Sequence, residues 1–332
     1  MIVVAGEALV DLVGEPDGRY RPVPGGSPAN VAVGLARLET PTELLARLGT
    51  GVFGALVREH LTRNGVGLTH AVQATEPATL AVVSLDADGR ASYDFYVSGT
   101  ADWGWRPDEL PGELPATATA LCTGSLAIAL APGAAEITKL VRRERERGQA
   151  TVVVDPNIRP ALLGDITQAR ILLNGVIETA DVVKVSDEDL GWLEPDTPVE
   201  QVAASWLDHG PALVVVTRGD RGAYAATQGG EAVTVPARRV PLIDTVGAGD
   251  AFTSGLVDAL RRRGLLGGAE GREGLAGLTA ATLTEVVDDA GLVAAITCSR
   301  RGADPPTSSE VAALRGAAAE GSSPAGPTHA DM

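Results

Sequence analysis

Aromatic side chains and thiols are scarce in this chain. Aromatic residues make up 3% of the 332 positions, and the two cysteines, Cys122 and Cys298, are too few for a disulfide framework, so we expect buried free thiols. The four histidines have no metal-ligand spacing, which argues against a zinc site. The fold therefore has to depend on an aliphatic core, which a chain of this length can build.

Basic charge and long apolar runs are also in short supply. Lys and Arg number 27 against 43 Asp and Glu, a net charge of -16 that repels nucleic acid and anionic membranes, so we expect neither as a partner. The apolar stretch Leu121–Ile137 is interrupted by glycine and proline and is too short to span a membrane. The N-terminus lacks the basic segment of a signal peptide and carries Glu7 and Asp11, which favours a cytoplasmic location.

Short β-branched runs alternate with helical patterns along the chain. Thr151–Asp155, Asp181–Val185 and Ala212–Thr217 are typical of buried strands, while Ala134–Arg147 and Ile166–Glu178 have helical periodicity. Strands that alternate with helices of this length indicate βαβ units. The pattern predicts an α/β fold of the doubly wound class with a mostly parallel sheet.

Two further runs have no helix between them. Thr79–Leu85 and Ala91–Val97 are separated by Asp-Ala-Asp-Gly-Arg at 86–90, which is typical of a hairpin turn. We expect a small antiparallel β lid, formed by about residues 10–25 and 78–100. At the other end, Ala, Gly, Ser and Pro dominate, so we expect one domain over 1–310 and a disordered tail over 311–332.

The Gly-rich segment DTVGAGD, at 244–250, follows a short apolar run and precedes a helical pattern. Gly247 and Gly249 allow backbone amides to converge, and the start of a helix favours an anion. Asp250 is then placed to take a proton from an acceptor hydroxyl in phosphoryl transfer, although it could instead be a charge that stabilises the helix end. The chain lacks both the P-loop motif and the third glycine of the dinucleotide fingerprint.

A second glycine pair lies near the N-terminus. Gly25 and Gly26 allow a ligand to approach the backbone, Ser27 is a predicted N-cap, and Pro28 suits the first helical position. Asn30 then lies in the first turn, where its amide offers a donor and an acceptor to a hydroxyl-rich ligand. The alternative is that Asn30 is an ordinary polar residue at a helix start.

Two segments together, GGSPANVAVGLARL at 25–38 and DTVGAGDAFTSGL at 244–256, resemble the two signatures of the ribokinase-like (PfkB) carbohydrate kinases. The resemblance extends over about residues 1–306, and DPNIRP at 155–160 and VVTRGDRGA at 215–223 are similar to segments of bacterial fructokinases. It implies an ATP-dependent sugar kinase in which Asp250 is the general base. The amides of Gly247, Ala248 and Gly249 would form its anion hole.

The same resemblance implies the binding positions. Those for the sugar are Asp11, Gly25, Gly26, Asn30 and Arg159. Those for ATP are Lys184, Ser186, Thr217, Gly219 and Gly222. Magnesium is implied as well, with Asp189 acting through water where the family usually has Glu, and the carbonyls of Asp244 and Val246 match a K⁺ site of some members.

The lid bears on the choice of sugar. In ketodeoxygluconate kinases an Arg tends to follow a lid Tyr, whereas here Tyr96 is followed by Val97. This favours a neutral ketose, with fructose converted to fructose 6-phosphate, over 2-keto-3-deoxygluconate, ribose or a nucleoside. Trp103 and Trp105 either stack on the sugar or pack in the core. A non-catalytic sugar or nucleotide sensor is the alternative of another class, and the lid strands offer a surface for a homodimer.

Overall fold

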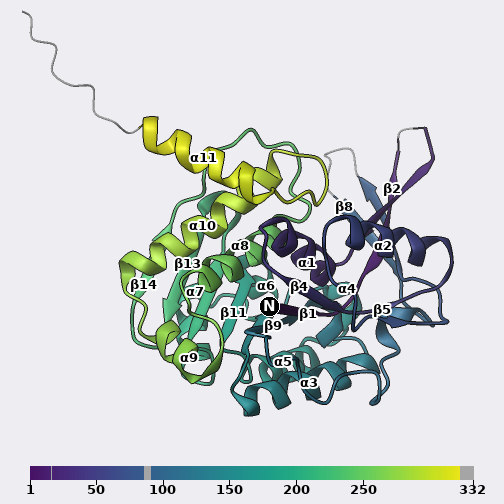
Figure 1. The fold of residues 1–332 in the computed structure, drawn as a ribbon, viewed down its shortest axis with the longest axis horizontal. Helices are drawn as coiled ribbons and strands as arrows, with labels where there is room; N and C mark the ends of the chain where they lie inside the picture. The colour runs from purple at the N-terminus through teal and green to yellow at the C-terminus, as the bar shows by residue number, and fades with distance from the viewer. Residues whose placement is uncertain (16, 86–90, 322–332) are drawn as a thin grey trace, which may run out of the picture.

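The structure is a computed structural model that describes residues 1–15, 17–85 and 91–321. An eight-stranded sheet in the order β14-β13-β12-β11-β10-β9-β1-β4 forms its centre (Figure 1). The strands are β1 (Ile2–Ala5), β4 (Thr42–Leu45), β9 (Ala120–Gly124), β10 (Thr151–Asp155), β11 (Val182–Ser186), β12 (Leu213–Thr217), β13 (Ala223–Thr227) and β14 (Ala232–Val235). The six strands from β4 to β12 pair in parallel and the last two antiparallel, which confirms the predicted mostly parallel sheet.

Helices cover both faces of this sheet, as a doubly wound fold requires. One face packs against α1 (Ser27–Arg37), α8 (Ala248–Arg262) and α10 (Ala280–Cys298), and the other against α3 (Gly133–Arg147), α5 (Ile166–Ile177) and α7 (Val199–Leu207). On β10, Val153 belongs to the first core cluster while Val152 and Val154 belong to the second. The strands are therefore buried on both faces, which explains their continuous aliphatic runs.

The remaining elements lie around this core. They are α2 (Gly51–Arg63), α4 (Pro160–Leu163), α6 (Asp187–Leu193), α9 (Gly268–Ala276), α11 (Ser308–Gly321) and the strand pair β5 (Arg47–Leu48) and β6 (Val72–Gln73). Trp103 and Trp105 are both buried, and Trp105 packs with Leu114 and Ile137 in the second core cluster. This favours core packing over sugar stacking for Trp105.

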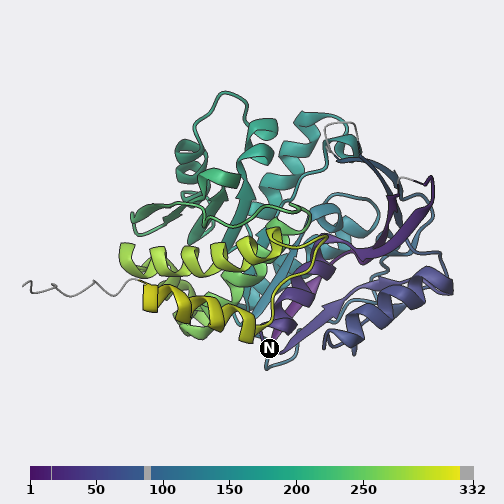
Figure 2. The same ribbon diagram turned by 90° about the horizontal axis from the view of Figure 1, so that it is seen from above.

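The lid is a four-stranded sheet in the order β3-β2-β7-β8, at one end of the molecule (Figure 2). Its strands are β2 (Leu9–Gly14), β3 (Tyr20–Gly25), β7 (Leu80–Leu85) and β8 (Ala91–Tyr96). β2–β3 and β7–β8 are antiparallel, but β2 and β7 pair in parallel, so the lid is mixed rather than wholly antiparallel. The predicted turn at 86–90 lies outside the described residues.

The C-terminal segment differs from the expected tail. Helix α11 begins at Ser308 and runs to Gly321, past the predicted boundary at 311. Val311 is buried against Leu292 and Ile296 of α10, so apolar packing extends the folded part beyond the boundary that composition suggested. Residues 322–332 of the predicted tail lie outside the described residues.

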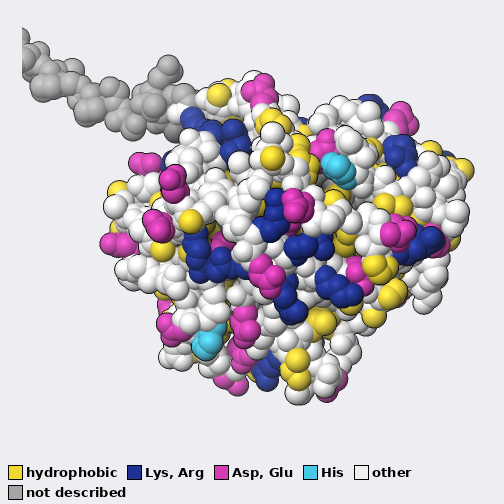
Figure 3. Space-filling view, turned by 60° about the horizontal axis from the view of Figure 1, so that its bottom comes forward, with side chains coloured by type: hydrophobic (Ala, Val, Ile, Leu, Met, Phe, Trp, Pro, Cys, Tyr) yellow, Lys and Arg dark blue, Asp and Glu magenta, His cyan; other side chains and the backbone are white. Residues whose placement is uncertain are grey.

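Surface charge is mixed in sign. Basic side chains gather near the middle of the face in Figure 3, but acidic side chains lie among them and hydrophobic ones are scattered. Asp181, for example, pairs with both Arg145 and Arg272. None of the helices in the described ranges has the length and apolar character that a membrane crossing requires.

Candidate active site

Asp250 lies in the first turn of α8 and meets α1, which is more than 200 residues away in sequence. Its carboxylate accepts hydrogen bonds from the Ser27 hydroxyl (2.6 Å, to Oδ1) and from the Asn30 amide (2.8 Å, to Oδ2). The side chain is 8% exposed. The two glycine-containing segments singled out in the sequence therefore meet at one carboxylate.

The helix that carries Asn30 begins differently from the prediction. Gly26, with φ of 99°, is the N-cap of α1, so Ser27 is a helical residue and not the cap. The Ser27 hydroxyl is used for Asp250 instead of the helix end. Ser27 is thus a site residue that sequence reasoning missed, and its place between Gly26 and Asn30 was the available signal.

The pKa of Asp250 is raised. Burial is the main cause and the negative charge of Asp155 adds to it, while the bonds from Ser27 and Asn30 and the charge of Lys184 act in the opposite direction. Each carboxylate oxygen has two lone pairs, so Asp250 retains acceptor capacity for a further hydroxyl. A carboxylate with a raised pKa is a better proton acceptor near neutral pH.

The predicted anion hole lies beside this carboxylate. Gly247 is the N-cap of α8 with φ of 74°, and a Cβ there would lie 2.5 Å from the Cβ of Ala303, so glycine is required. The Ala248 amide, predicted to be part of the anion hole, instead donates to the Thr245 carbonyl at 3.1 Å and is engaged in the turn. The amides of Gly249 and Asp250 follow in the first helical turn, where donors lack an intrahelical acceptor.

Lys184 reaches the same point from β11. Its Nζ would be 3.1 Å from a Cβ at Gly249, and it forms a buried ion pair with Asp155 Oδ2 at 2.9 Å. Thr253 on α8 donates to that same oxygen at 2.9 Å. Asp155 thus joins β10, β11 and α8 next to the predicted phosphate position, although it was not among the predicted site residues. Its place in DPNIRP, directly at a strand end, was the signal.

The sugar side of the site faces Asp250 from the lid. Asp11 lies on β2, and burial, with the charge of Asp250, raises its pKa to about 6, while Arg159 lowers it. A Cβ at Gly25 would lie 2.3 Å from Asp11 Oδ2, and one at Gly26 would lie 2.7 Å from the Glu7 carbonyl oxygen. Gly25 therefore leaves space for the Asp11 carboxylate, and Gly26 is required by the backbone of Glu7 and by its own positive φ.

Arg159 lies between the sugar and nucleotide sides. Its guanidinium folds back to donate to Asn157 Oδ1 (2.7 Å) and to the Ile158 carbonyl (3.0 Å). Its charge lowers the pKa of both Asp11 and Asp189. Arg159 thus lies close enough to Asp11 and Asp189 for its positive charge to act on both carboxylates.

The predicted nucleotide residues lie at neighbouring strand ends. Ser186 and Thr217 are register partners at the ends of β11 and β12. Gly219 and Gly222 both have positive φ, and a Cβ at Gly222 would lie 2.0 Å from the Val235 carbonyl oxygen. The carboxyl ends of parallel strands are where ligands bind in open α/β sheets. The contact with the Val235 carbonyl is by itself enough to require glycine at position 222, whether or not a nucleotide binds there.

Asp189 has a structural partner for each oxygen. Oδ1 accepts from the Ile158 amide at 3.0 Å and Oδ2 from the Ser186 amide at 3.5 Å, while Ser186 Oγ accepts from the Asp189 amide at 3.0 Å. The pair forms a capping box for α6. Burial raises the pKa of Asp189. A role for it in holding metal-bound water stays a prediction.

The donor set fits a magnesium–nucleotide complex. In the described part of the chain no three His, Cys, Asp or Glu side chains form a metal cluster. Asp155 Oδ1, however, is a buried carboxylate oxygen without a hydrogen-bond partner among the described residues. Magnesium is usually held by one or two carboxylates together with substrate phosphates and water, which suits this arrangement.

The predicted K⁺ segment is folded as a tight loop. The Asp244 carboxylate accepts from the Val246 amide (3.0 Å) and from the Gly302 amide (2.7 Å). These bonds fix the loop that carries the two carbonyls. Whether those carbonyls bind a cation stays a prediction.

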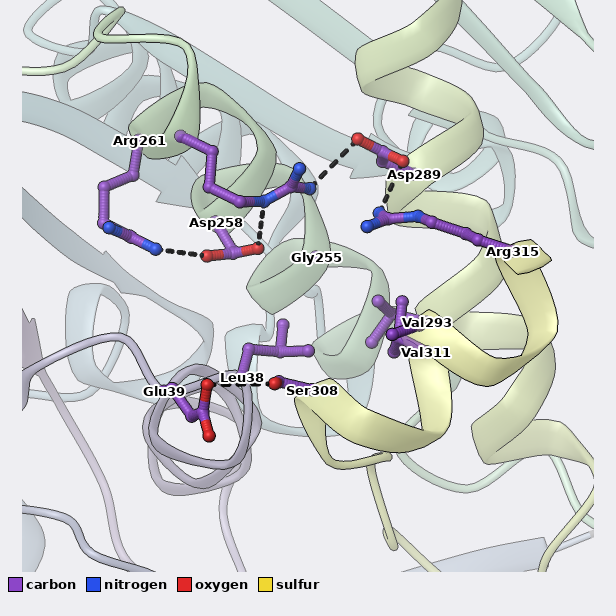
Figure 4. Close-up of a pocket in the computed structure, with 12 residues that line it drawn as sticks. Leu38, Glu39, Gly255, Asp258, Arg261, Asp289, Val293, Ser308, Val311 and Arg315 are labelled. Carbon is purple, nitrogen blue, oxygen red and sulfur yellow. Dashed lines mark hydrogen bonds and ion pairs between the residues drawn. The ribbon is translucent and has the colours of Figure 1, made fainter.

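A separate cavity of about 320 Å³ is lined by α8, α10, α11 and the residues that end α1 (Figure 4). Most of its charged side chains pair with one another, as Asp258 does with Arg261 at 3.0 Å and Asp289 with Arg315, while Glu39 accepts from the Ser308 hydroxyl. Asp250 is not among its lining residues. We therefore assign the active site to the residues around Asp250 and not to this cavity.

Comparisons with known proteins agree with this geometry. Residues 1–310 match the pfkB family carbohydrate kinase profile. The chain is similar to a fructokinase of Rhizobium leguminosarum bv. trifolii, with 36% identity over 272 residues that cover 80% of this chain and 81% of that protein.

Solved structures extend the similarity to the whole fold. A double-mutant fructokinase of Vibrio cholerae bound to fructose, ADP and potassium has a TM-score of 0.80 at 28% identity, with 94% of this chain and 98% of that chain covered. Aminoimidazole riboside kinase of Salmonella enterica, complexed with aminoimidazole riboside and an ATP analogue, has a TM-score of 0.79 at 27% identity. The match covers 94% of this chain and 99% of that chain. The chain belongs to the PfkB family of carbohydrate kinases and is an ATP-dependent phosphotransferase that acts on an alcohol group.

Proposed function

We propose that this kinase phosphorylates a primary hydroxyl of fructose, a neutral ketose, to give fructose 6-phosphate. The observation that carries the proposal is the buried Asp250 carboxylate in the first turn of α8, held by Ser27 and Asn30 beside the predicted sugar-binding glycines. The similar proteins named fructokinase, one of them with bound fructose, support fructose as the acceptor.

The reaction follows from the positions of the side chains. Asp250 removes the proton of the acceptor hydroxyl as its oxygen attacks the γ-phosphorus of ATP; a new O–P bond forms while the bond to the β-phosphate oxygen breaks and ADP leaves. The amides of Gly249 and Asp250 and the ammonium of Lys184 stabilise the charge on the moving phosphoryl group. The proton leaves Asp250 after the product.

Asp11, Gly25, Gly26, Asn30 and Arg159 are proposed to hold the sugar hydroxyls. Strand pairing places Asp11, Ala81 and Phe95 in one row across the lid, whereas Tyr96 belongs to the neighbouring row and is 61% exposed. Val97 is the first residue after β8, and it stands where ketodeoxygluconate kinases tend to have an Arg. The uncharged side chain at this position supports a neutral sugar over an acidic one.

ATP is proposed to lie along Lys184, Ser186, Thr217, Gly219 and Gly222. When bound, Mg²⁺ would neutralise phosphate charge, held by Asp155 Oδ1 and by Asp189 through water. Potassium at the Asp244 and Val246 carbonyls is a further proposal, supported by the potassium in the Vibrio cholerae structure. We also propose that the enzyme works in the cytoplasm.

The proposed acceptor is tested with a panel of sugars. ADP release is measured with fructose, ribose, 2-keto-3-deoxygluconate and nucleosides, with EDTA and K⁺-free controls. We expect the highest kcat/KM with fructose, loss of activity with EDTA and its return with Mg²⁺.

Each other outcome has a defined meaning. If kcat/KM is higher with ribose, a nucleoside or 2-keto-3-deoxygluconate than with fructose, that compound and not fructose is the preferred acceptor. No ADP release with any sugar, together with a rise in Tm when sugar or ATP is added, replaces the kinase by a non-catalytic sensor.

A further inference from the structure

The lid strands cross into the main body at few points. β2 begins one residue after Ala8, β7 begins one residue after Thr79, and the chain returns from β8 through Thr100 into the short 3₁₀ helix η1 (Ala101–Trp103), which contains Asp102. These four residues, Ala8, Thr79, Thr100 and Asp102, are called the hinge cluster below.

Hydrogen bonds join the members of the hinge cluster. The Ala8 amide donates to Asp102 Oδ1 at 2.8 Å, and the hydroxyls of Thr79 and Thr100 are 2.6 Å apart. The Val10 amide, on β2, donates to the Thr79 carbonyl at 3.0 Å. The starts of β2 and β7 and the return from β8 are therefore connected side by side.

The main body fixes η1 in place. Ala101 donates through its amide to the Pro77 carbonyl (2.9 Å) and accepts at its own carbonyl from Arg47 (2.7 Å). Arg47 is fully buried and pairs with Glu109 at 2.9 Å. Asp102 is thus attached to the body, while the amide it holds belongs to the lid's first strand.

The Asp102 carboxylate is costly at this position. It is 3% exposed, no described cation pairs with it, and its Oδ2 has no hydrogen-bond partner among the described residues. Burial raises its pKa to about 6, and the neighbouring carboxyl of Glu7, itself 1% exposed, has its pKa raised to about 7, also chiefly by burial. Buried carboxylates that have hydrogen-bond donors but no described cation beside them are retained against a substantial desolvation cost.

We propose that Asp102 is a positioning residue for sugar binding, which holds the start of β2 through Ala8 and so places Asp11 opposite Asp250. This inference depends on the proposed role of Asp11 as a sugar ligand. Asp11 lies three residues after Ala8 on the same extended segment, so a shift of the Ala8 amide moves Asp11 with it. A misplacement of about 1 Å of a positioned group can cost on the order of 10²-fold in catalytic rate.

The test compares Asp102→Ala with Asp102→Asn, whose amide oxygen still accepts from Ala8. We expect Asp102→Ala to raise KM for fructose at least about tenfold, with kcat changed less than about threefold and KM for ATP unchanged, because the misplaced group is a binding residue. Asp102→Asn restores KM to within about threefold of the parent. Asp94→Asn, on the exposed part of β8, is the matched control and leaves all constants unchanged.

Fructose affinity from tryptophan fluorescence gives a readout that does not depend on turnover, and Tm reports folding. A folded Asp102→Ala enzyme with the parent's KM and affinity for fructose overturns the proposal. So does a result in which Asp102→Ala and Asp102→Asn are equally impaired in kcat, in KM for fructose, in KM for ATP and in Tm. If Asp102→Ala does not fold, Thr79→Val, which removes the link to Thr100, decides: a raised fructose KM supports the proposal and an unchanged one overturns it. If the parent enzyme prefers another sugar, that sugar is used, which separates this inference from the choice of fructose.

Discussion

Several acidic side chains are buried where the lid meets the main body, and the fold raises the pKa of each. Glu7, Asp11, Asp102 and Asp250 all have burial as the first cause. Perturbed carboxyls that gather in a cleft are typical of functional sites. Their cost in stability depends on pH, which makes it measurable.

Glu7 shows this cost most clearly. Its pKa rises from 4.5 to about 7, so the folded state holds its proton more tightly than the unfolded chain does. The contribution of Glu7 to the free energy of unfolding is therefore fully present below pH 4.5 and is lost as the pH rises to about 7. We predict that Glu7→Gln raises the free energy of unfolding at pH 8, by up to about 3 kcal/mol, and leaves it nearly unchanged at pH 4.5. Urea unfolding at both pH values checks this, and a variant less stable at pH 8 contradicts it.

Two short motifs, at 25–30 and 244–250, were enough to predict several residues of the site from the sequence. The glycines around 25 and 247 and the acid at 250 carry chemistry that is local in sequence. Ser27 and Asp155 were missed because their roles arise from contacts with residues 223 and 98 positions away, respectively. A local pattern cannot show such contacts.

Among the elements, α8 combines two demands at its N-terminus. Its first turn carries the amides of Gly249 and Asp250, which lack an intrahelical acceptor, and Gly249 leaves space for the Lys184 ammonium. Alanine is the better helix former by about 1 kcal/mol, so glycine at this position is retained at a cost to the helix.

We predict that Gly249→Ala raises KM for ATP and lowers kcat, because the added Cβ displaces Lys184 Nζ, while Tm stays the same or rises. Gly291→Ala in α10, where a Cβ meets nothing within 4 Å, is the matched control and raises Tm without changing the kinetics. Thermal unfolding and initial rates check both variants. If Gly249→Ala has the same kcat and KM for ATP as the parent, the space that Gly249 leaves for Lys184 has no role in ATP binding or catalysis.

Element prediction succeeded where periodicity was strong and failed where tertiary packing decided. α3 and α5 begin and end within one residue of the predicted spans. Helix α11 runs past the expected start of the tail at 311, because Val311 gains burial against α10 that composition does not reveal. The parallel pairing of β2 with β7 was missed for a similar reason, since it joins strands about 70 residues apart.

At the scale of the whole molecule, the lid face opposite Asp11 is only partly covered: Val10 is buried in the first core cluster, whereas two tyrosines of this face are exposed. Tyr20 is 54% exposed and Tyr96 61%, and both lie in the rows opposite to Asp11. A sheet face with exposed aromatic residues suits a second copy, so we propose a homodimer through the lid.

We predict that the enzyme elutes as a dimer in size-exclusion chromatography with light scattering, and that Tyr96→Asp shifts it to a monomer. Ile171→Asp, at an equally exposed position on α5, is the control and leaves the mass unchanged. A parent protein that is monomeric over the micromolar range contradicts this use of the lid.

The fold joins the two halves of the site through Asp250, and the role of this carboxylate is tested most directly by replacing it with an isostere. Asp250→Asn keeps the contacts to Ser27 or Asn30 in part but cannot accept a proton, so we predict a fall in kcat of about 10²–10⁴-fold or more, with Tm and fructose affinity close to those of the parent. An Asp250→Asn enzyme that retains kcat within about tenfold of the parent would contradict the assignment of the catalytic base.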